Sequence, residues 1–486
     1  MGERITIDPI TRLEGHGRIE IILDAEGNVA DAFWQVLELR GFERFCLGRP
    51  AEEMTRIAPN ICGICPSAHH MAATKALDRL YGVDPPATAL LVRELEYNAS
   101  LVDDHFLHFF FLAAPDFICG PDADPAERNM MGVIQRLGSA FGRRVIEIRR
   151  KNRDIIRLVF GKAPHPEGGL PGGVPKGITE EERRWIAATA EETVQFAGRA
   201  LAIFREKVLD DPTNRALLED EAYRVRTCSM ALVDSERRVA FYEGKVRVVD
   251  PRGDEVCCFA PDSYGERIAE RVEPWTFIRT TYLRQRGWQG LVEHDDTPLY
   301  KVGPLARLNA ADAMATPLAQ AAYEEFRSCF GGMPVHQTLA THWARLICAL
   351  QAAERNREIA ADPLLTGHHL RNLDFNLTGR GVGCVEAPRG ILFHDYRTDE
   401  KGILTAVNMI IATQNNAGPI SLAITKAARR FIRGGEVREG LLNRVEMAFR
   451  AFDPCLSCAT HALPGAMPLN VQIRDHLGNI LMQLRR

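Results

Sequence analysis

The sequence predicts a mainly helical α+β protein, with a central bundle of long helices and several small antiparallel sheets. Three observations support this prediction. Long stretches carry apolar residues at the three- and four-residue spacing of helices, and shorter stretches alternate apolar and polar residues as strands do. Cysteine pairs stand near both ends of the 486-residue chain, so we expect the N- and C-terminal motifs to meet at one buried site.

The N-terminal residues are typical of strands. "RITIDPI" and "GRIEIILDAEGNVADAFWQVLEL" alternate apolar and polar residues around the turn "DAEGN". From about Pro85 the spacing becomes helical, first in "TALLVRELEYNASLVDDHFLHFFFLAAPD" and then in "MMGVIQRLGSAFGRRVIEIRRKNRDIIRLVF". A further helix is predicted to begin at Thr179, after the loop "GKAPHPEGGLPGGVPKG", because Glu182 completes a capping box.

The rest of the chain mixes both kinds of element. Residues 217–303 are rich in turns and predict short strands and loops. Helices resume in "AAYEEFRSCF" and "HQTLATHWARLICALQAAERNREIAA", and a strand pair follows in "GCVEAPRGILFHDYRTDEKGILTAVNMIIAT". A last helix is expected at about residues 440–452, and a small hairpin around His476–Gly478.

The composition excludes several classes of function. The chain has 60 Lys and Arg residues against 64 Asp and Glu residues, a net charge of −4, with no basic block that would attract nucleic acid. No N-terminal stretch resembles a signal peptide, and the longest apolar runs are far shorter than the roughly 20 residues that span a bilayer. We therefore expect a cytoplasmic protein without a membrane span, although a subunit can also be exported through the signal of a partner.

Two cysteine motifs have the spacing of metal ligands. Eight of the 12 cysteines stand singly or adjacent, and we expect them to be small buried hydrophobic residues. The pairs Cys62/Cys65 and Cys455/Cys458 have CxxC spacing, which suits zinc, an iron–sulfur cluster or another thiophilic ion. Structural zinc usually has its pairs roughly 15–20 residues apart. The much longer separation here favours one site at the heart of a single interlocked domain, residues 1–461.

The motifs around these cysteines carry a family resemblance. "RLEGHGR", "RGFE", "CGIC" with a histidine four residues on, "HFLHFF" with "PD" after it, "EAPRG" and "DPCLSCATH" occur in this order. From about residue 4 to its end, the chain resembles the large, catalytic subunit of nickel–iron hydrogenases, in particular the soluble cytoplasmic groups. The family often has Arg two residues before the first cysteine, where this chain has Asn60, a change that removes no metal ligand.

The resemblance implies a buried bimetal site. All four cysteines would bind nickel, with Cys62 and Cys455 as terminal ligands and Cys65 and Cys458 as bridges to an iron. In the family that iron carries one carbon monoxide and two cyanides. His69 would support a bridging sulfur through its ring N–H, whereas His70 matches no such role and is expected to be structural.

The resemblance also implies a route for the proton. H2 would be cleaved heterolytically, with the thiolate of Cys455 as the nearest base. Glu14 of "RLEGH" would then carry the proton away. Without the cysteines, a carboxylate paired with Arg12 or Arg18 would be the default interpretation of Glu14.

Three further motifs would complete the surroundings of the metals. Arg389 of "EAPRG" would place its guanidinium over the open metal position, held there by Asp116 of "APD". Pro388, Arg389 and Thr413 match positions that contact the cyanides in the family. A dry pocket that donates hydrogen bonds is what such anions require.

A second metal and a removable tail are also implied. A magnesium-like ion would be bound by Glu43, by the carbonyl of Met409 and by His461, because oxygen-rich ligands fit a hard cation. In many relatives an endopeptidase cuts directly after the last histidine. Residues 462–486 would then be a maturation tag, unless they stay as a hairpin on the body.

Two other classes of protein are considered beside a hydrogenase. The quinone-site subunit of respiratory complex I shares the fold but lacks the four cysteines, and a zinc-stapled structural protein would not need "EAPRG". As a hydrogenase subunit, the chain would pass electrons from H2 to an iron–sulfur small subunit. Flavin- and NAD(P)-linked or ferredoxin-linked subunits would then carry them to a soluble acceptor, because no dinucleotide motif lies in this chain.

Overall fold

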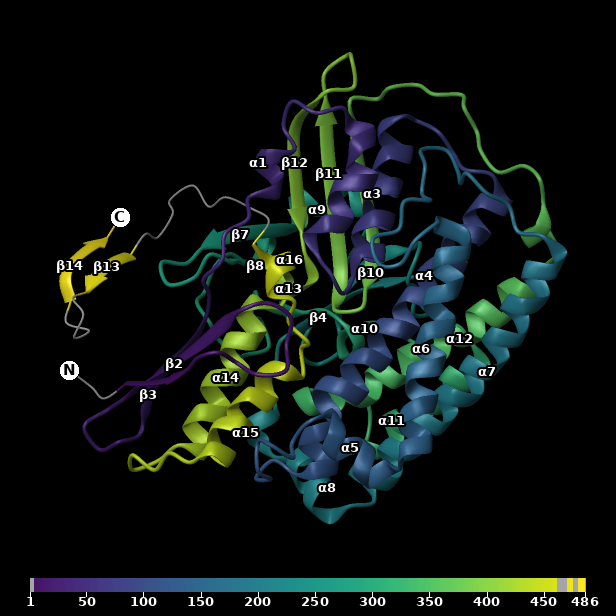
Figure 1. Cartoon of the computed structure of the whole chain (residues 1–486). Helices are drawn as coiled ribbons and strands as arrows, with labels where there is room; N and C mark the ends of the chain where they lie inside the picture. The colour runs from purple at the N-terminus through teal and green to yellow at the C-terminus, as the bar shows by residue number, and fades with distance from the viewer. Residues whose placement is uncertain (1–3, 461–469, 475–479, 486) are drawn as a thin grey trace.

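The computed structural model describes residues 4–460, 470–474 and 480–485 and shows the predicted mixture of helices with small antiparallel sheets (Figure 1). The N-terminal strands are confirmed: β1 (Arg4–Ile7), β2 (Gly17–Leu23) and β3 (Val29–Val36) form an antiparallel sheet in that order. This sheet is fixed to the C-terminal part of the chain, because the indole of Trp34 on β3 donates to Ser421 on α14 (Ala417–Phe431).

Four long helices form the bundle seen on the right of Figure 1: α4 (Ala87–Leu107), α6 (Ser139–Phe160), α7 (Glu180–Phe204) and α12 (Thr341–Ala361). The capping box at the start of α7 is confirmed, since Thr179 accepts from the Glu182 N–H and Glu182 accepts from the Thr179 N–H. The second predicted helical stretch divides into α5 (Met130–Leu137) and α6 at Gly138, whose φ of 92° interrupts a right-handed helix.

The chain remains helical after the end of α4 at Leu107, but with a different geometry. The chain continues through π-helical turns at His108–Ala113 and Pro115–Cys119, in which each turn is wider than in an α-helix. The sequence spacing did not predict this change.

The predicted strand pair near residue 390 is a three-stranded sheet of β10 (Arg380–Ala387), β11 (Gly390–Thr398) and β12 (Leu404–Ile410). Helix α3 (Pro66–Leu80) packs against β10 at very short range. A Cβ atom added at Gly383 would lie 1.9 Å from the Ala72 carbonyl oxygen, and one at Gly381 would lie 2.0 Å from that of Ala76. Two glycines therefore allow the backbone of this helix to touch the strand.

The remaining elements surround this centre. The turn-rich middle contains, as predicted, short strands: β4 (Cys228–Val233), β5 (Lys245–Val249), β6 (Glu255–Phe259), β7 (Ile268–Val272), β8 (Arg279–Leu283) and β9 (Tyr300–Lys301). The other helices are α1 (Phe42–Phe45), α2 (Met54–Ile57), α8 (Pro212–Glu219), α9 (Tyr264–Arg267), α10 (Pro304–Ala310), α11 (Pro317–Cys329), α13 (Ala412–Asn415), α15 (Glu439–Arg450) and α16 (Leu456–Ala459). Near the C-terminus β13 (Asn470–Arg474) pairs with β14 (Ile480–Arg485), whereas the turn predicted at 476–478 lies outside the described residues.

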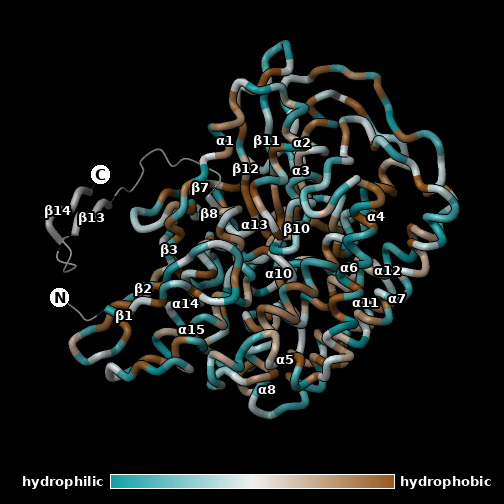
Figure 2. The backbone as a smooth tube through the Cα atoms, viewed as in Figure 1, coloured by the Kyte–Doolittle hydropathy of each residue, from teal (hydrophilic) through white to brown (hydrophobic). Residues whose placement is uncertain are grey.

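One large hydrophobic core joins the bundle, the α3–β10 layer and the C-terminal helices, and hydrophobic segments gather in the interior of the tube drawing (Figure 2). Of the eight cysteines that were expected to be buried, four are: Cys46, Cys228, Cys348 and Cys384. The expectation is wrong for the other four, since Cys119, Cys257 and Cys329 are only partly buried and Cys258 is exposed. Within the described residues, no helix is both long and apolar enough to cross a membrane.

Candidate metal centre

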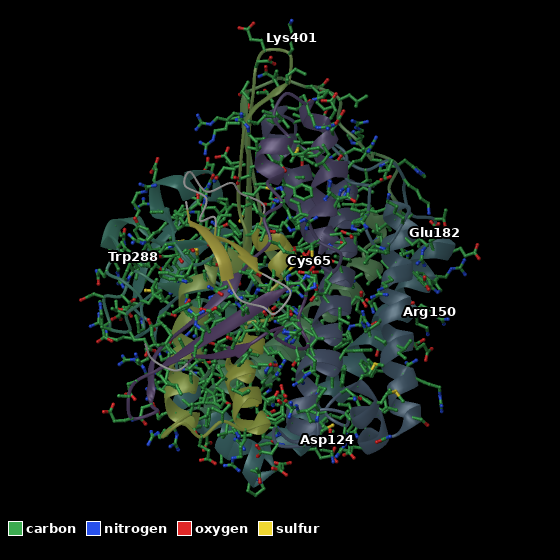
Figure 3. The ribbon with its side chains drawn as sticks, turned by 60° about the vertical axis from the view of Figure 1, so that its left-hand side comes forward. Cys65, Asp124, Arg150, Glu182, Trp288 and Lys401 are labelled. Atoms are coloured by element: carbon green, nitrogen blue, oxygen red, sulfur yellow. The ribbon has the colours of Figure 1, made fainter. Side chains whose placement is uncertain are left out.

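The two cysteine pairs meet in the interior. The Sγ atom of Cys62 lies 3.3 Å from that of Cys455 and 3.2 Å from that of Cys65. The sulfur of Cys458 lies 2.8 Å from that of Cys455 and 3.6 Å from that of Cys65. All four residues are buried and their sulfurs lie within 4.8 Å of one another. Figure 3 shows Cys65 near the middle of the molecule, with Lys401, Trp288, Glu182, Arg150 and Asp124 toward its outline.

Local structure delivers each sulfur to this point. Cys62 follows a short helical turn, Ala58–Ile61, and Cys65 immediately precedes α3, which begins with a proline at its first position. Cys455 is the residue before α16, and Cys458 lies within that helix. Each pair is therefore fixed by the start of a helix.

The donor set fits a thiophilic metal. Hydrogen bonds with the other three thiols outweigh the effect of burial and lower the pKa of Cys62 well below its ordinary value. Burial and the neighbouring thiols raise the pKa of Cys455 well above that value, and burial raises that of Cys458 in the same way. Four adjacent buried thiols can therefore become thiolates together only if a cation balances their charge.

Glu14 approaches the sulfurs directly. The Cys455 thiol donates to Glu14 Oε2 at 3.0 Å, and the Ser457 N–H donates to the same oxygen at 3.0 Å. Gly15 makes this approach possible, since its φ is 84° and an added Cβ would lie 2.9 Å from the Cβ of Leu456. The default interpretation of Glu14 does not hold, because Arg12 pairs with Asp116 and Arg18 with Glu20.

A small cavity borders the sulfurs. It is lined by Cys65, His69, Ala387, Arg389, Leu392, Ile411, Ala412, Thr413, Cys455 and Cys458. The Thr413 hydroxyl accepts from the Cys455 N–H at 3.0 Å, and so ties the start of α13 to the second cysteine pair. Pro388 and Arg389 form the buried two-residue turn between β10 and β11.

Comparison with known proteins decides what this centre is. The profile of the family described as nickel-dependent hydrogenase matches residues 40–137 and 292–461, and one described as HoxL-like matches residues 4–39. The chain belongs to the nickel-dependent hydrogenases. It is the catalytic subunit of a nickel–iron hydrogenase, an oxidoreductase that acts on H2. This excludes the zinc-stapled protein as well as the complex I subunit.

Its relatives include subunits of F420-non-reducing and NAD-reducing hydrogenases. The chain is 45% identical over 484 residues to a protein of Archaeoglobus profundus named as an iron-sulfur subunit of F420-non-reducing hydrogenase, covering 99% of each chain. It is 37% identical over 502 residues to the NAD-reducing hydrogenase HoxS subunit beta of Cupriavidus necator, covering 100% of each. A crystal structure of an NAD+-reducing NiFe hydrogenase in the H2-reduced state superposes with a TM-score of 0.89 at 38% identity, covering 94% of this chain and 99% of that one.

His69 in this hydrogenase lies at the second cysteine pair. Its Nε2 lies 3.5 Å from the sulfur of Cys458, and its Nδ1 lies 3.2 Å from Nε2 of His394. His394 in turn reaches the Tyr396 hydroxyl at 2.5 Å. His70 is buried away from the sulfurs, between the Thr55 carbonyl oxygen and the Gly169 N–H, and burial lowers its pKa to about 4.

Arg389 is held by two carboxylates, neither of which is Asp116. Its Nη1 donates to Asp104 Oδ2 at 3.1 Å and its Nη2 to Asp453 Oδ1 at 3.1 Å, while its Nε donates to the Asp453 carbonyl oxygen at 2.7 Å. All three side chains are buried. The expected contact between Arg389 and Asp116 is therefore corrected.

Asp116 lies in a separate buried cluster. Its carboxylate receives hydrogen bonds from Arg12 at 2.5 Å, Arg450 at 2.6 Å and Asn443 at 3.2 Å. Burial alone would raise the pKa of Asp116, but Arg450 and Arg12 hold it below its ordinary value. Asp104 lies within α4, whereas Asp116 lies in the π-helical turns further along the chain, so the two carboxylates reach different arginines.

The residues expected to bind a hard cation are described in part. The Met409 N–H on β12 donates to Glu43 Oε1 at 2.7 Å, so these two residues are neighbours. Burial raises the pKa of Glu43 to about 7. His461, the third expected ligand, lies outside the described residues.

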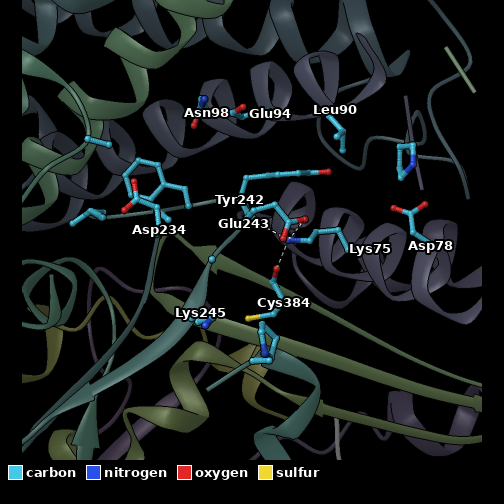
Figure 4. Close-up of a pocket in the computed structure, with 18 of the residues that line it drawn as sticks. Lys75, Asp78, Leu90, Glu94, Asn98, Asp234, Tyr242, Glu243, Lys245 and Cys384 are labelled. Carbon is cyan, nitrogen blue, oxygen red and sulfur yellow. Dashed lines mark hydrogen bonds and ion pairs between the residues drawn. The ribbon is translucent and has the colours of Figure 1, made fainter. Parts of the chain in front are cut away.

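A large cleft lies elsewhere in the described residues (Figure 4). It measures about 1400 Å³ and runs beside Lys75, Tyr242 and Glu243. Lys75 donates there to the Cys384 carbonyl oxygen at 2.8 Å and pairs with Glu243 at 3.1 Å. None of the four clustered cysteines lines this cleft, so size alone does not identify the reactive centre.

The sequence interpretation missed Asp104, Asp453 and His394. Asp453 stands two residues before Cys455 within "DPCLSCATH", and Asp104 stands within a stretch dense in histidine and phenylalanine. A carboxylate so close to a ligand cysteine was a usable signal for Asp453. The contact of His394 depends on the pairing of β11 with its neighbours, which no local pattern encodes.

Proposed function

We propose that this hydrogenase subunit cleaves H2 heterolytically, with the sulfur of Cys455 as the first proton acceptor and Glu14 as the next carrier. The observation that supports this proposal is the 3.0 Å contact between Cys455 Sγ and Glu14 Oε2. Cys62, Cys65, Cys455 and Cys458 would hold the nickel, with Cys65 and Cys458 shared with iron. When bound, the nickel–iron pair with its carbon monoxide and cyanides supplies the polarisation of H2 and the storage of electrons.

Glu14 is suited to carry a proton outward. Its side chain is half-buried, so the carboxylate lies between the buried sulfurs and the surface. The N–H of Ser457 fixes the oxygen that faces Cys455 at 3.0 Å. A carboxylate within hydrogen-bond distance of the proton donor meets the geometric requirement for general acid–base catalysis.

Arg389 and Thr413 shape the cavity beside the sulfurs. The guanidinium of Arg389 is fixed by Asp104 and Asp453 and lines the cavity together with Cys65 and Cys455. A fixed planar cation excludes water and donates hydrogen bonds toward small anionic ligands such as cyanide. His69 would support the sulfur of Cys458 from the other side.

Electrons would leave through an iron–sulfur partner subunit. Across the described residues, one group of ligand-type side chains lies close enough for a metal, and it is the cysteine cluster. The relatives are named as subunits of F420-non-reducing and NAD-reducing hydrogenases. We infer a complex in which the iron–sulfur subunit passes electrons to NAD(P)-linked or ferredoxin-linked partners in the cytoplasm.

A magnesium-like ion would complete the C-terminal region. The support for it is the half-buried carboxylate of Glu43, which accepts from the backbone N–H of Met409. A divalent cation would compensate the cost of burying that charge. His461 and the Met409 carbonyl oxygen would supply further ligands.

The test is analysis of the purified complex. We expect nickel and iron in this chain, H2-dependent exchange of deuterium with solvent, and H2-dependent reduction of NAD(P)+ or ferredoxin. A chain that contains zinc in place of nickel, and exchanges no deuterium, would contradict the proposal. Reduction of neither acceptor by a complex that still exchanges deuterium would contradict only the inference about partners.

A further inference from the structure

A second arginine stands behind the one that lines the cavity. Arg345 on α12 is completely buried, and its Nη1 lies 3.1 Å from Oδ2 of Asp453. The other carboxylate oxygen of Asp453, Oδ1, accepts from Arg389. The two oxygens of one carboxylate are thus divided between two guanidinium groups. Any rotation that weakens one contact changes the other.

Arg345 is itself anchored to the helix bundle. Its Nη1 also lies 3.0 Å from Nδ1 of His105 on α4. Burial, together with Arg345, lowers the pKa of His105 well below its ordinary value, so the ring is neutral and Nδ1 accepts. The position of Arg345 is therefore set by α4 and α12, two long helices of the bundle.

Two guanidinium groups and two carboxylates form one buried network: Arg389 contacts Asp104 and Asp453, and Arg345 contacts Asp453. Without Arg345, two carboxylates would share one guanidinium in a medium of low dielectric constant. Such an imbalance favours rearrangement of the side chains.

The backbone of Asp453 shows why this support matters. Its φ is 55°, in the left-handed region that non-glycine residues rarely adopt. Its carbonyl oxygen and carboxylate both accept from Arg389, and it stands two residues before Cys455. A non-glycine residue keeps this unfavourable backbone conformation only where several contacts with its surroundings hold it in place.

We propose that Arg345 is a positioning residue, which orients Asp453 and through it fixes the guanidinium of Arg389 against the metal cavity. Arg345 itself does not border that cavity. This inference rests on the proposed function, and assigns one step of it to a residue of the helix bundle. A displacement of about 1 Å at a reacting group can lower a rate by roughly 100-fold.

The alternative is a purely structural ion pair, and the chain offers a matched control for it. Arg93 on α4 is also completely buried and donates to Asp78 at 2.6 Å. Arg93→Met and Arg345→Met each remove a buried guanidinium that contacts a carboxylate. The carboxylate that loses its partner in Arg93→Met is Asp78, which lies away from the four sulfurs. Both variants should unfold at lower temperature than the wild type.

The experiment uses the complex and three readouts besides folding: nickel per chain, H2/deuterium exchange per nickel, and the infrared bands of the carbon monoxide and cyanides on iron. Arg345→Met should keep nickel, exchange about 10- to 100-fold more slowly and show displaced or divided bands. Arg345→Lys should recover most of the exchange, because an ammonium group can contact Asp453 and His105 from one atom. Arg93→Met should exchange normally per nickel, with unchanged bands.

Several results would overturn the proposal. Normal exchange and unchanged bands in Arg345→Met would do so, and so would a lysine variant no better than the methionine variant. If Arg345→Met binds no nickel, Arg345→Gln replaces it, and unchanged bands there would equally refute the role. Failure of the proposed function is distinguishable, since wild-type protein would then lack nickel or exchange.

Discussion

At the scale of single residues, Glu14 provides the sharpest test of the proton route. In Glu14→Gln the amide keeps the shape of the side chain but cannot take a proton from Cys455. We expect nickel and iron to be retained while H2/deuterium exchange falls by a factor of about 100 to 10,000, the usual contribution of a general acid or base. Exchange measured by mass spectrometry checks this expectation.

A nearby carboxylate supplies the control for Glu14. Glu38 contacts His16 at 2.6 Å on the exposed part of the same sheet region. Glu38→Gln should exchange as the wild type does. Near-normal exchange in Glu14→Gln would show that the proton leaves Cys455 by another path.

Asp116 should matter for stability in a way that depends on pH. Asp116→Asn removes the carboxylate that pairs with both Arg12 and Arg450, although Arg450 keeps its contact with Glu446, and loss of a buried partner costs about 3 kcal/mol of unfolding free energy. The pKa of Asp116 is held below its ordinary value, near 3.9, so this stabilisation is present above that pH and is lost as the pH falls.

Unfolding by denaturant at several pH values measures this difference. The advantage of the wild type over Asp116→Asn should be largest near neutral pH and should shrink below about pH 4. A difference that does not change with pH would contradict the assignment. H2/deuterium exchange per nickel should change less in Asp116→Asn than in Asp104→Asn, because Asp104 contacts Arg389.

The contrast between Asp104 and Asp116 shows where residue-level prediction failed. Motif spacing located the four cysteines, Glu14 and Arg389, because each lies in a distinctive local pattern. The partner of Arg389 depended instead on which carboxylate of this helical region lies beside the turn between β10 and β11. That is a tertiary contact, made by Asp104 on α4, and sequence spacing does not reveal it.

At the scale of elements, the contact between α3 and β10 determines where His69 and the first cysteine pair lie. Gly383→Ala would push a Cβ atom to within 1.9 Å of the Ala72 carbonyl oxygen, so the helix must move away from the strand. We expect lower thermal stability and lower nickel content, measured by calorimetry and by metal analysis. Full nickel content in a folded Gly383→Ala protein would show that the site tolerates this movement.

Gly198 provides the matched substitution. It lies on the exposed side of α7 with nothing within 4 Å of an added Cβ. Gly198→Ala should stabilise the protein by about 0.5–1 kcal/mol, since alanine favours a helix interior, and should leave nickel content unchanged.

Element prediction succeeded where the pattern was strong and local. The capping box at Thr179 and the alternation in β1–β3 appear in the structure as predicted. The third strand of the β10–β12 sheet and the break at Gly138 were missed, although the polar turn "DEKG" and the glycine itself were signals for them in the sequence. The need for glycine at Gly381 and Gly383 of β10 becomes clear only from the structure, in which α3 packs directly on that strand.

At the scale of the whole molecule, the metal centre joins the two ends of the chain. Because Cys62 and Cys455 belong to opposite ends, bound metal should stabilise the entire fold by mass action. Nickel-loaded protein should unfold at a higher temperature than metal-free protein. Cys62→Ala should lose nickel, activity and the rise in unfolding temperature that nickel causes. Cys348 is a buried cysteine of α12 outside the cluster, and Cys348→Ala should keep all three properties.

Residues 462–486 should be removed when the enzyme matures. The Thr460 carbonyl oxygen accepts from the N–H groups of Arg40 and Gly41 at 3.0 and 3.2 Å, so the chain is anchored just before the predicted cut. Cleavage between His461 and Ala462 would leave these hydrogen bonds intact. His461, the expected ligand, would then be the C-terminal residue. Intact-mass measurement of active, nickel-loaded protein should therefore show a chain that ends at His461. A fully active chain that still ends at Arg486 would show instead that the segment containing β13 and β14 is a permanent part of the enzyme.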